Sequence, residues 1–158
     1  KQGKFSHTYP ERMWPRYASA TDDLNDRPIG PDGSNRGIRY RYGDLADLVN
    51  LLKTRPHTRQ AYLPIWFPED TGAHHGERVP CTIGYHFLTR DGKTKIVYYM
   101  RSCDFLRYFR DDVYMAGRLL QWVCEKVGTK PSKLVMHISS LHIFEADLII
   151  MKQRRNMP

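Results

Sequence analysis

The chain has 158 residues, of which 41% are hydrophobic and 27% charged, a composition typical of one soluble globular domain. No apolar stretch approaches the roughly 18–20 residues that a membrane-spanning helix needs, and no apolar signal core follows the basic N-terminus, so we expect no membrane partner and a cytoplasmic location. The three cysteines lack CxxC spacing and are odd in number, which argues against a disulfide scaffold and against a zinc site.

The net charge of +8 comes from basic residues that are scattered along the chain. Their densest groups lie at residues 36–41, 107–110 and 152–155. A surface that binds nucleic acid concentrates its positive charge on one face or along one stripe. The scattered pattern is more typical of a solvated basic surface, so charge alone predicts no nucleic-acid partner.

The first 36 residues are rich in proline, glycine, aspartate and asparagine, which predicts an irregular N-terminal extension with room for one short helix. An island of apolar residues interrupts this extension at residues 13–18. We therefore divide the chain into the extension, residues 1–36, and one core domain, residues 37–158.

The core domain begins with leucines at helical spacing after Asp44, a residue that favours the N-cap position, and they predict a helix over residues 44–53. Residues 59–67 have the pattern of a strand. Residues 68–78 are predicted to form a loop that contains His74 and His75. A metal site would need a further ligand beside these two histidines, so the loop predicts no metal.

Two predicted strands, residues 79–89 and 94–101, flank Asp91-Gly92, a dipeptide that favours the tight turn of a β-hairpin. A helix follows from Asp111 or Asp112 to residue 127, with Cys124 on its buried face. A strand at residues 133–144 and an apolar helix from residue 146 come last. Because strands and helices mix without regular alternation, the sequence predicts a single-domain α+β fold.

Cys81 lies near the start of the first hairpin strand, directly after Pro80. Odd-numbered residues 79–87 would share one strand face, so one interpretation of Cys81 is a buried core thiol. Another is a nucleophile, because Pro80 places the thiol near a strand end and nearby arginines favour the thiolate. One hairpin later, Arg101 and Ser102 supply the forked donors and the hydroxyl that fit a phosphate monoester.

Several motifs of this chain resemble those of thymidylate synthase and its relative deoxycytidylate hydroxymethylase. In order and spacing, they are Arg59, Pro80-Cys81, Arg101-Ser102-Cys103-Asp104 and His142-Ile143-Phe144. The resemblance runs from about residue 37 to residue 148, with a weaker similarity at residues 13–18 to the family's tryptophan segment. It implies a mixed sheet packed by helices, a homodimer with sheet against sheet, and one-carbon transfer from methylene-tetrahydrofolate to a pyrimidine nucleoside monophosphate.

The resemblance also implies roles for the residues around the nucleotide. Cys81 would be the thiolate that adds to carbon 6 of the pyrimidine, which gives carbon 5 carbanion character. Arg101 and Ser102 would hold the nucleotide phosphate. Arg59 would reach the same phosphate from the partner subunit.

Further roles follow for the sugar and the folate. His142 would contact the sugar hydroxyl, and Asp104 would contact both the pterin and the pyrimidine. Trp14 would line the folate pocket. The tyrosine of the family's His-x-Tyr motif is Phe144 here, which removes a hydroxyl from the sugar site and leaves the choice between ribose and deoxyribose open.

The position eight residues after Asp104 distinguishes the two branches of the family. The synthases have an asparagine there whose amide pairs with uracil, whereas this chain has Asp112, as the deoxycytidylate hydroxymethylases do. A carboxylate only accepts hydrogen bonds, so it suits the exocyclic amine of cytosine and a protonated ring nitrogen. Alternatively, Asp112 only caps the helix that starts beside it, although Asp111 could serve as that cap.

Other positions depart from the family pattern. The second arginine of the phosphate pair is Gln60, the histidine after the cysteine is Thr82, and the glutamine before the arginine-serine pair is Met100. The family's proton-shuttling glutamate would lie upstream of this sequence, and its folate-closing segment downstream. We therefore expect either a portion of a longer enzyme or a shortened relative.

Together these observations predict a folate-dependent hydroxymethylase that acts on carbon 5 of a cytidine monophosphate, with the deoxyribonucleotide preferred. One alternative is a thymidylate synthase that acts on deoxyuridine monophosphate and tolerates Asp112. A second is a non-catalytic relative that binds nucleotides or RNA. In a third, the resemblance is accidental and Cys81 is a core thiol.

Overall fold

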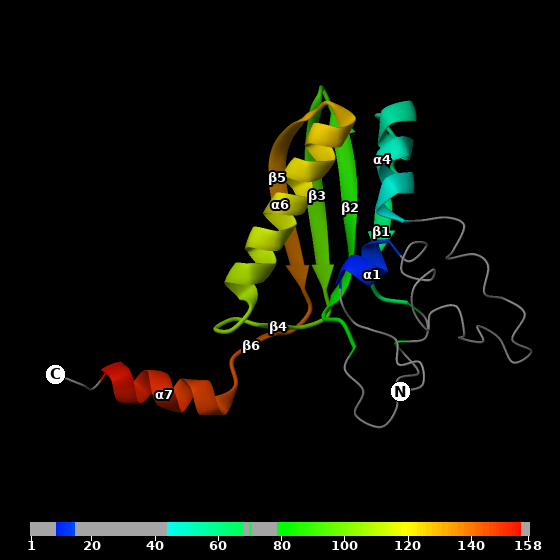
Figure 1. Cartoon of the computed structure of the whole chain (residues 1–158). Helices are drawn as coiled ribbons and strands as arrows, with labels where there is room; N and C mark the ends of the chain where they lie inside the picture. Colours follow the sequence, from blue (N-terminus) through cyan, green and yellow to red (C-terminus); the bar gives the residue numbers. More distant parts are fainter. Residues whose placement is uncertain (1–8, 15–43, 68–69, 71–78, 156–158) are drawn as a thin grey trace, which may run out of the picture.

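The computed structural model describes residues 9–14, 44–67, 70 and 79–155. Within these ranges a mixed four-stranded sheet, in the order β1-β2-β3-β5, forms the body of the chain (Figure 1). Its strands are β1 (Tyr62–Pro64), β2 (Thr82–Arg90), β3 (Lys93–Met100) and β5 (Lys130–Ile138). Neighbouring strands are antiparallel except β3 and β5, which are parallel. The predicted α+β fold is confirmed.

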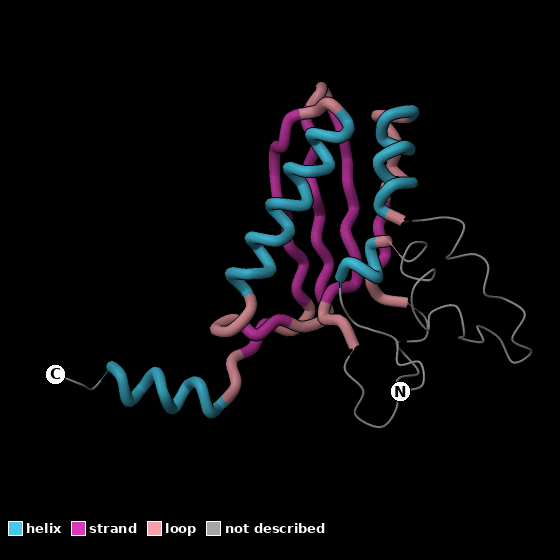
Figure 2. Tube along the Cα trace, in the orientation of Figure 1, coloured by secondary structure: helices cyan, strands magenta, loops and turns pink. Residues whose placement is uncertain are grey.

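Two helices, α4 (Leu45–Thr54) and α6 (Phe109–Val127), lie on one face of this sheet and contact each other (Figures 1 and 2). Asp44 caps α4 as predicted, because its side chain accepts a hydrogen bond from the Asp47 amide at 2.9 Å. α6 provides the crossover that the parallel pair requires. It begins before Asp111 and Asp112, both of which lie in its first turn. The predicted cap at either aspartate is therefore wrong.

The core lies between the two helices and the sheet. Its fully buried members include Tyr85 and Phe87 of β2, Ile96 and Tyr98 of β3, and Val123 of α6. Cys124 is buried among them, as predicted. A short helix, α1 (Tyr9–Met13), falls in the segment predicted to be an irregular extension, and Met13 also packs into this core. The proposed domain boundary at residue 36 and His74 and His75 lie outside the described residues.

The hairpin between β2 and β3 has the turn that the sequence predicts. Asp91 and Gly92 both have positive φ values, 51° and 69°, as a tight hairpin turn requires. At the other end of β2 the pairing is irregular, because Thr82 pairs with Met100 and Gly84 already pairs with Tyr99. The extra residue, Ile83, forms a β-bulge that interrupts the strand alternation. The prediction that odd-numbered residues 79–87 share one face is therefore wrong. The even-numbered Thr82 and the odd-numbered Tyr85 are both buried.

The opposite face of the sheet is covered by none of the described helices. Aromatic rings form a row across it, with Tyr62 6.3 Å from Tyr99 and Tyr99 stacked on His137 at 5.3 Å. Gly84 lies beneath this row, where an added Cβ would collide with the Tyr62 ring and the Leu63 carbonyl oxygen. Among the described residues, this face is therefore a partly aromatic sheet surface, which we call the open face.

The strand predicted at residues 133–144 is two strands in the structure. β5 ends at Ile138, and β6 (Leu141–His142) then pairs in parallel with β4 (Cys103–Asp104). The last helix, α7 (Glu145–Arg155), begins one residue before the predicted start and extends away from the sheet (Figure 1). In the part of the chain that is described, no helix is both long and apolar enough to cross a membrane.

Candidate active site

A cavity of about 430 Å³ lies where β2 begins and β3 ends. The lining residues are Tyr9, Val79, Pro80, Cys81, Ser102, Cys103, Asp104, Tyr108, Asp111, Asp112 and Met115. The volume is in the range of small-molecule sites. Four residues that the sequence singled out, Cys81, Ser102, Asp104 and Asp112, therefore line one cavity although they come from three separate segments.

Cys81 is half-buried and sits immediately before β2. Its carbonyl oxygen accepts a hydrogen bond from the Arg101 amide at 2.9 Å, which holds this segment to the end of β3. The β-bulge at Ile83 breaks the alternation between Cys81 and the core residues of β2. As a result, the thiol belongs to the cavity wall and is not a fully buried core side chain.

A second thiol, Cys103, lines the same cavity but is buried. Its Sγ lies 3.6 Å from Asp112 Oδ2, to which it donates. Burial, together with the adjacent Asp112 carboxylate, raises the pKa of the Cys103 thiol to about 12. Because only a thiolate is a strong nucleophile, Cys103 is held in the unreactive form, and Cys81 is the better candidate of the two.

Asp112 presents its carboxyl group to the cavity from the first turn of α6. Oδ1 accepts a hydrogen bond from the Tyr98 hydroxyl at 3.4 Å, and Oδ2 accepts from Cys103. Burial raises the pKa of Asp112 above its usual range, and the two hydrogen bonds oppose part of that rise. Among the described residues its carboxyl group caps no backbone amide, and each oxygen keeps a further lone pair that a ligand in the cavity can use.

A chain of hydroxyl groups, which sequence reasoning missed, leads from Asp112 to Tyr9. The Tyr98 hydroxyl lies 2.7 Å from Thr82 Oγ1, which in turn lies 2.7 Å from the Tyr9 hydroxyl. Tyr98 and Thr82 are buried, whereas Tyr9 lines the cavity. No local pattern in the sequence links these residues, because Tyr9 and Thr82 are 73 positions apart.

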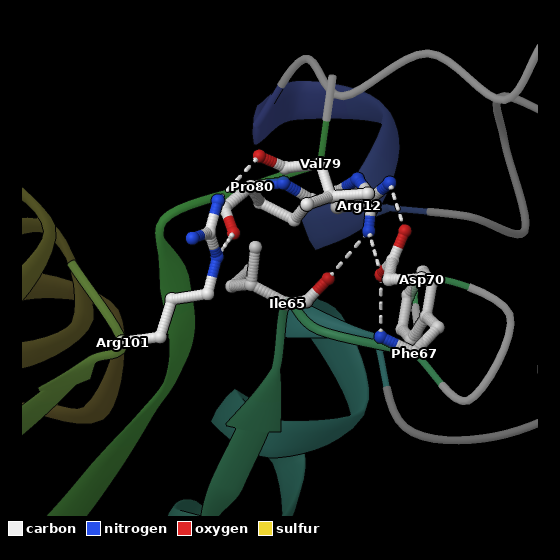
Figure 3. A network of polar contacts seen from close by, with 7 residues as sticks. All are labelled: Arg12, Ile65, Phe67, Asp70, Val79, Pro80 and Arg101. Atoms are coloured by element: carbon white, nitrogen blue, oxygen red, sulfur yellow. Dashed lines mark hydrogen bonds and ion pairs between the residues drawn. The ribbon is translucent and has the colours of Figure 1, made fainter. Parts of the chain in front are cut away.

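Arg101 lies beside the cavity rather than in its lining. Its Nε donates to the Pro80 carbonyl at 3.0 Å and its Nη2 to the Val79 carbonyl at 3.3 Å (Figure 3). The guanidinium carbon also sits 5.5 Å from the centre of the Trp66 ring. These contacts orient the positive charge next to the segment that carries Cys81. The predicted phosphate contact of Arg101 stays a prediction.

A buried ion pair fixes α1, the helix that carries Tyr9, against the rest of the site. Arg12 donates to both carboxylate oxygens of Asp70, at 2.7 and 2.9 Å, and to the Ile65 carbonyl (Figure 3). Asp70 Oδ2 also accepts from the Phe67 amide at 2.7 Å. Both side chains are nearly fully buried, so removing either one leaves the other charge buried without this partner.

Replacing Asp70 with alanine is expected to lower the free energy of unfolding by about 3 kcal/mol, because it leaves the Arg12 charge buried without its carboxylate. Urea denaturation followed by circular dichroism measures this effect. Asp147→Ala is the matched control, because Asp147 pairs with the half-exposed Arg107, and its loss should cost less than about 1 kcal/mol. Equal effects of the two substitutions would contradict the assignment of the Arg12–Asp70 pair.

Asp104 has one satisfied and one unsatisfied carboxylate oxygen. Oδ1 accepts from the amides of Leu106 and Arg107, at 3.1 and 3.2 Å. Oδ2 is buried, has no hydrogen-bond partner among the described residues, and lies 3.5 Å from Arg107 Nε. A buried carboxylate oxygen without a donor is costly, so Asp104, which lines the cavity, has unused capacity to accept a hydrogen bond from an N–H group.

The remaining residues named from the sequence lie outside the cavity lining. Trp14 packs edge-on against Trp122 at 6.1 Å. His142 is paired with Asp104 in the β4–β6 ladder and packs against Phe144 at 5.1 Å. The Arg59 side chain is exposed, and its carbonyl oxygen lies 3.0 Å from His86 Nε2. Their predicted roles in sugar, folate and phosphate binding stay predictions.

Comparison with known proteins connects this geometry to one family. The profile of the family described as thymidylate synthase matches residues 7–156. The chain is 34% identical over 101 residues to a protein named putative thymidylate synthase from Methanosarcina barkeri, and 33% identical over 101 residues to one from Methanosarcina mazei. Both alignments cover 63% of this chain.

A third relative, named thymidylate synthase, comes from Rhizorhabdus wittichii and is 26% identical over 132 residues, 83% of this chain. The aligned regions cover 45% of each Methanosarcina protein and 39% of the Rhizorhabdus protein. The chain thus spans less than half the length of these relatives.

Proposed function

The chain belongs to the thymidylate synthase family, and from this premise we propose that it transfers a one-carbon unit to carbon 5 of a pyrimidine nucleoside monophosphate. The observation that carries the proposal is the placement of Cys81 and Asp112 in the lining of one cavity. In this cavity the thiol, as nucleophile, and the carboxyl group, which recognises the base, can reach the same pyrimidine ring. The match to the family profile supports the same reaction class.

Cys81 is the proposed nucleophile. Its sulfur forms a bond to carbon 6 of the ring, and the π electrons of the double bond between carbons 5 and 6 move to carbon 5. Carbon 5 then bonds to the one-carbon unit and loses its proton, and the carrier is released. Water adds to the resulting exocyclic methylene group, and the bond between carbon 6 and the Cys81 sulfur breaks. Ser102 lines the cavity beside Cys81, and the Arg101 guanidinium is held nearby, so both can receive the nucleotide phosphate.

Asp112 is the proposed determinant of the base. An ionised carboxylate accepts a hydrogen bond from the exocyclic amine of cytosine, whereas it repels the carbonyl oxygen that uracil presents at the same place. The raised pKa of Asp112 supports a second task, because a carboxyl group that titrates nearer neutral pH can also share a proton with the ring nitrogen. We therefore favour hydroxymethylation of deoxycytidine monophosphate.

One residue in the lining of the cavity, Asp104, fits the folate that the family implies. Asp104 Oδ2, buried and without a hydrogen-bond donor among the described residues, suits an N–H group of a pterin ring. Bound there, methylene-tetrahydrofolate would supply the one-carbon unit. The role of this chain is to hold the pterin through Asp104 and to keep the activated nucleotide beside it.

A direct test is release of tritium from carbon 5 of deoxycytidine monophosphate and of deoxyuridine monophosphate, each with methylene-tetrahydrofolate. Faster release from the cytosine nucleotide supports the proposal. Faster release from the uracil nucleotide supports thymidylate synthesis, the activity that the names of the relatives carry. Release from neither, with RNA affinity that falls steeply as salt rises, would support a non-catalytic binding protein.

The open face is the proposed surface for a second copy of the chain. It holds the row of rings from Tyr62 to His137, and Arg59 lies at its edge through its contact with His86. Tyrosine is among the residues that dominate stable interfaces. Two such faces packed together would bury the rings and bring Arg59 of one copy towards the other.

Substituting Tyr99 with aspartate is therefore expected to weaken the dimer at least about 30-fold, because it places a charge in the middle of the interface. Sedimentation equilibrium measures the dissociation constant. Gln121→Asp, on the exposed side of α6, adds the same charge away from the open face and should leave association unchanged. A monomeric native protein, or equal dimerisation of all three proteins, would contradict this interface.

A further inference from the structure

The chain of hydroxyl groups from Asp112 to Tyr9 has a direction that follows from counting its protons. Tyr98 donates to Asp112, which uses the single proton of its hydroxyl group. The proton in the 2.7 Å contact between Tyr98 and Thr82 must then come from Thr82. By the same reasoning, the proton between Thr82 and Tyr9 comes from Tyr9. With Asp112 ionised, every hydroxyl group therefore donates towards the carboxylate.

This direction determines what Tyr9 presents to the cavity. Its proton points inward to Thr82, so its oxygen offers lone pairs on the cavity side. If Asp112 becomes protonated, the chain can reverse, and Tyr9 then donates into the cavity. The hydrogen-bonding character of Tyr9 is thus coupled to the protonation state of a carboxyl group on another wall of the same cavity.

We propose that Tyr9, Thr82, Tyr98 and Asp112 form a proton relay between two walls of the cavity. A proton released in the cavity binds to the Tyr9 oxygen while the proton of Tyr9 passes to Thr82, that of Thr82 to Tyr98, and that of Tyr98 to Asp112 Oδ1. One proton enters, one carboxylate is neutralised, and each hydroxyl group ends with a single proton. No oxidant or other reactant is needed.

The surroundings of the relay support this use. Burial raises the pKa of both Tyr9 and Tyr98, which keeps the phenols neutral, so transfer proceeds by exchange of protons along the chain and not through a stored phenolate. Other ionisable groups also lie around the relay. Asp111 and Cys103 lie beside Asp112, but neither belongs to the hydroxyl chain, and Cys103 donates to the other oxygen of Asp112. The buried Tyr85 hydroxyl group interacts with Tyr98 and Thr82, and Cys81 lies near Tyr9.

The relay rests on the proposed function, because that reaction both releases a proton from carbon 5 and uses a carboxyl group at the ring nitrogen. Thr82 and Tyr98 do not line the cavity, so they act as positioning residues. Thr82 stands where the family has a histidine, and the relay gives its hydroxyl group a specific task.

Substituting Thr82 with valine tests the relay, because it removes the central hydroxyl group while nearly preserving side-chain shape. Tritium release from carbon 5 should fall about 100-fold, and Thr82→Ser should retain activity within about threefold. Thr94→Val is the matched control. Thr94 is also buried between two hydroxyl groups, those of Thr89 and Thr129, at 2.8 and 2.7 Å.

A second measurement does not depend on activity. Titration of the Asp112 carboxyl carbon by NMR in the full-length protein should show a raised pKa in Tyr98→Phe, which loses the hydrogen bond, and a smaller rise in Thr82→Val. Thr82→Ser and Thr94→Val should match the native protein. An Asp112 pKa that is unchanged in Thr82→Val would overturn the relay.

The two measurements separate the possible failures. If the native protein releases no tritium from any pyrimidine nucleotide, the proposed function is wrong, and the titration still decides whether Thr82 is coupled to Asp112. If the native protein is active and Thr82→Val retains full activity, the relay is wrong and the proposed function stands.

Discussion

Replacing Cys81 with serine is expected to reduce tritium release from carbon 5 of deoxycytidine monophosphate by about 10⁴-fold or more, the scale seen when a covalent nucleophile is removed. A serine hydroxyl keeps the size of the side chain but is protonated at neutral pH, so it cannot add to carbon 6. The release assay with methylene-tetrahydrofolate measures the loss directly. Binding of the nucleotide, measured by calorimetry, should change little.

The control for this substitution is Cys124→Ala. Cys124 is buried in the core on α6 and does not line the cavity, so its loss should leave the rate within about threefold, as for most changes away from reacting groups. Full activity in Cys81→Ser, or an equal loss in Cys124→Ala, would show that the thiol at position 81 is not the nucleophile.

The second large effect is expected from Asp112→Asn. An amide has both a donor and an acceptor, so it can pair with uracil. It accepts a hydrogen bond from the amine of cytosine less well than a carboxylate does. The ratio of kcat/KM for the cytosine and uracil nucleotides should shift towards uracil by about 10³-fold, because a buried polar group is left mispaired with the wrong base. Parallel assays with both nucleotides measure this ratio.

Stability provides an internal check on the same variant. Burial raises the pKa of Asp112, so the folded state binds a proton more tightly than the unfolded state does. The stability that this proton contributes is therefore lost as pH rises through the folded pKa. At pH 7 the ionised carboxylate therefore disfavours folding, and Asp112→Asn should be at least as stable as the native protein. If the variant is stable and its preference between the cytosine and uracil nucleotides is unchanged, Asp112 does not recognise the base.

Local sequence signals predicted those parts of the fold that depend on neighbours in the chain. The hairpin at Asp91-Gly92 and the capped helix after Asp44 are specified by the backbone requirements of one or two residues, so they appear in the structure as predicted. The Ile83 bulge was missed because an alternating apolar pattern contains no sign of an extra residue. That bulge separates Cys81 from the core face of β2.

The candidate site shows the same limit. Cys81, Ser102, Asp104 and Asp112 stand out as residue types with known chemistry, and the fold brings them to one cavity. Tyr9 could not be linked to them, because its position depends on the tertiary contacts that hold α1 in place.

The buried Arg12–Asp70 pair is one of these contacts. A charge pair 58 positions apart leaves no periodic trace in the sequence, so only the folded chain reveals it.

The most direct test of the account is the mass of the protein after incubation with methylene-tetrahydrofolate and 5-fluorodeoxycytidine monophosphate, whose fluorine cannot leave carbon 5 as a proton does. We expect the intact mass to increase by that of the nucleotide and the one-carbon donor, with peptide mapping that places the adduct on Cys81. An unmodified protein, or an adduct on Cys103, would contradict the central claim that the Cys81 sulfur attacks a pyrimidine bound in this cavity.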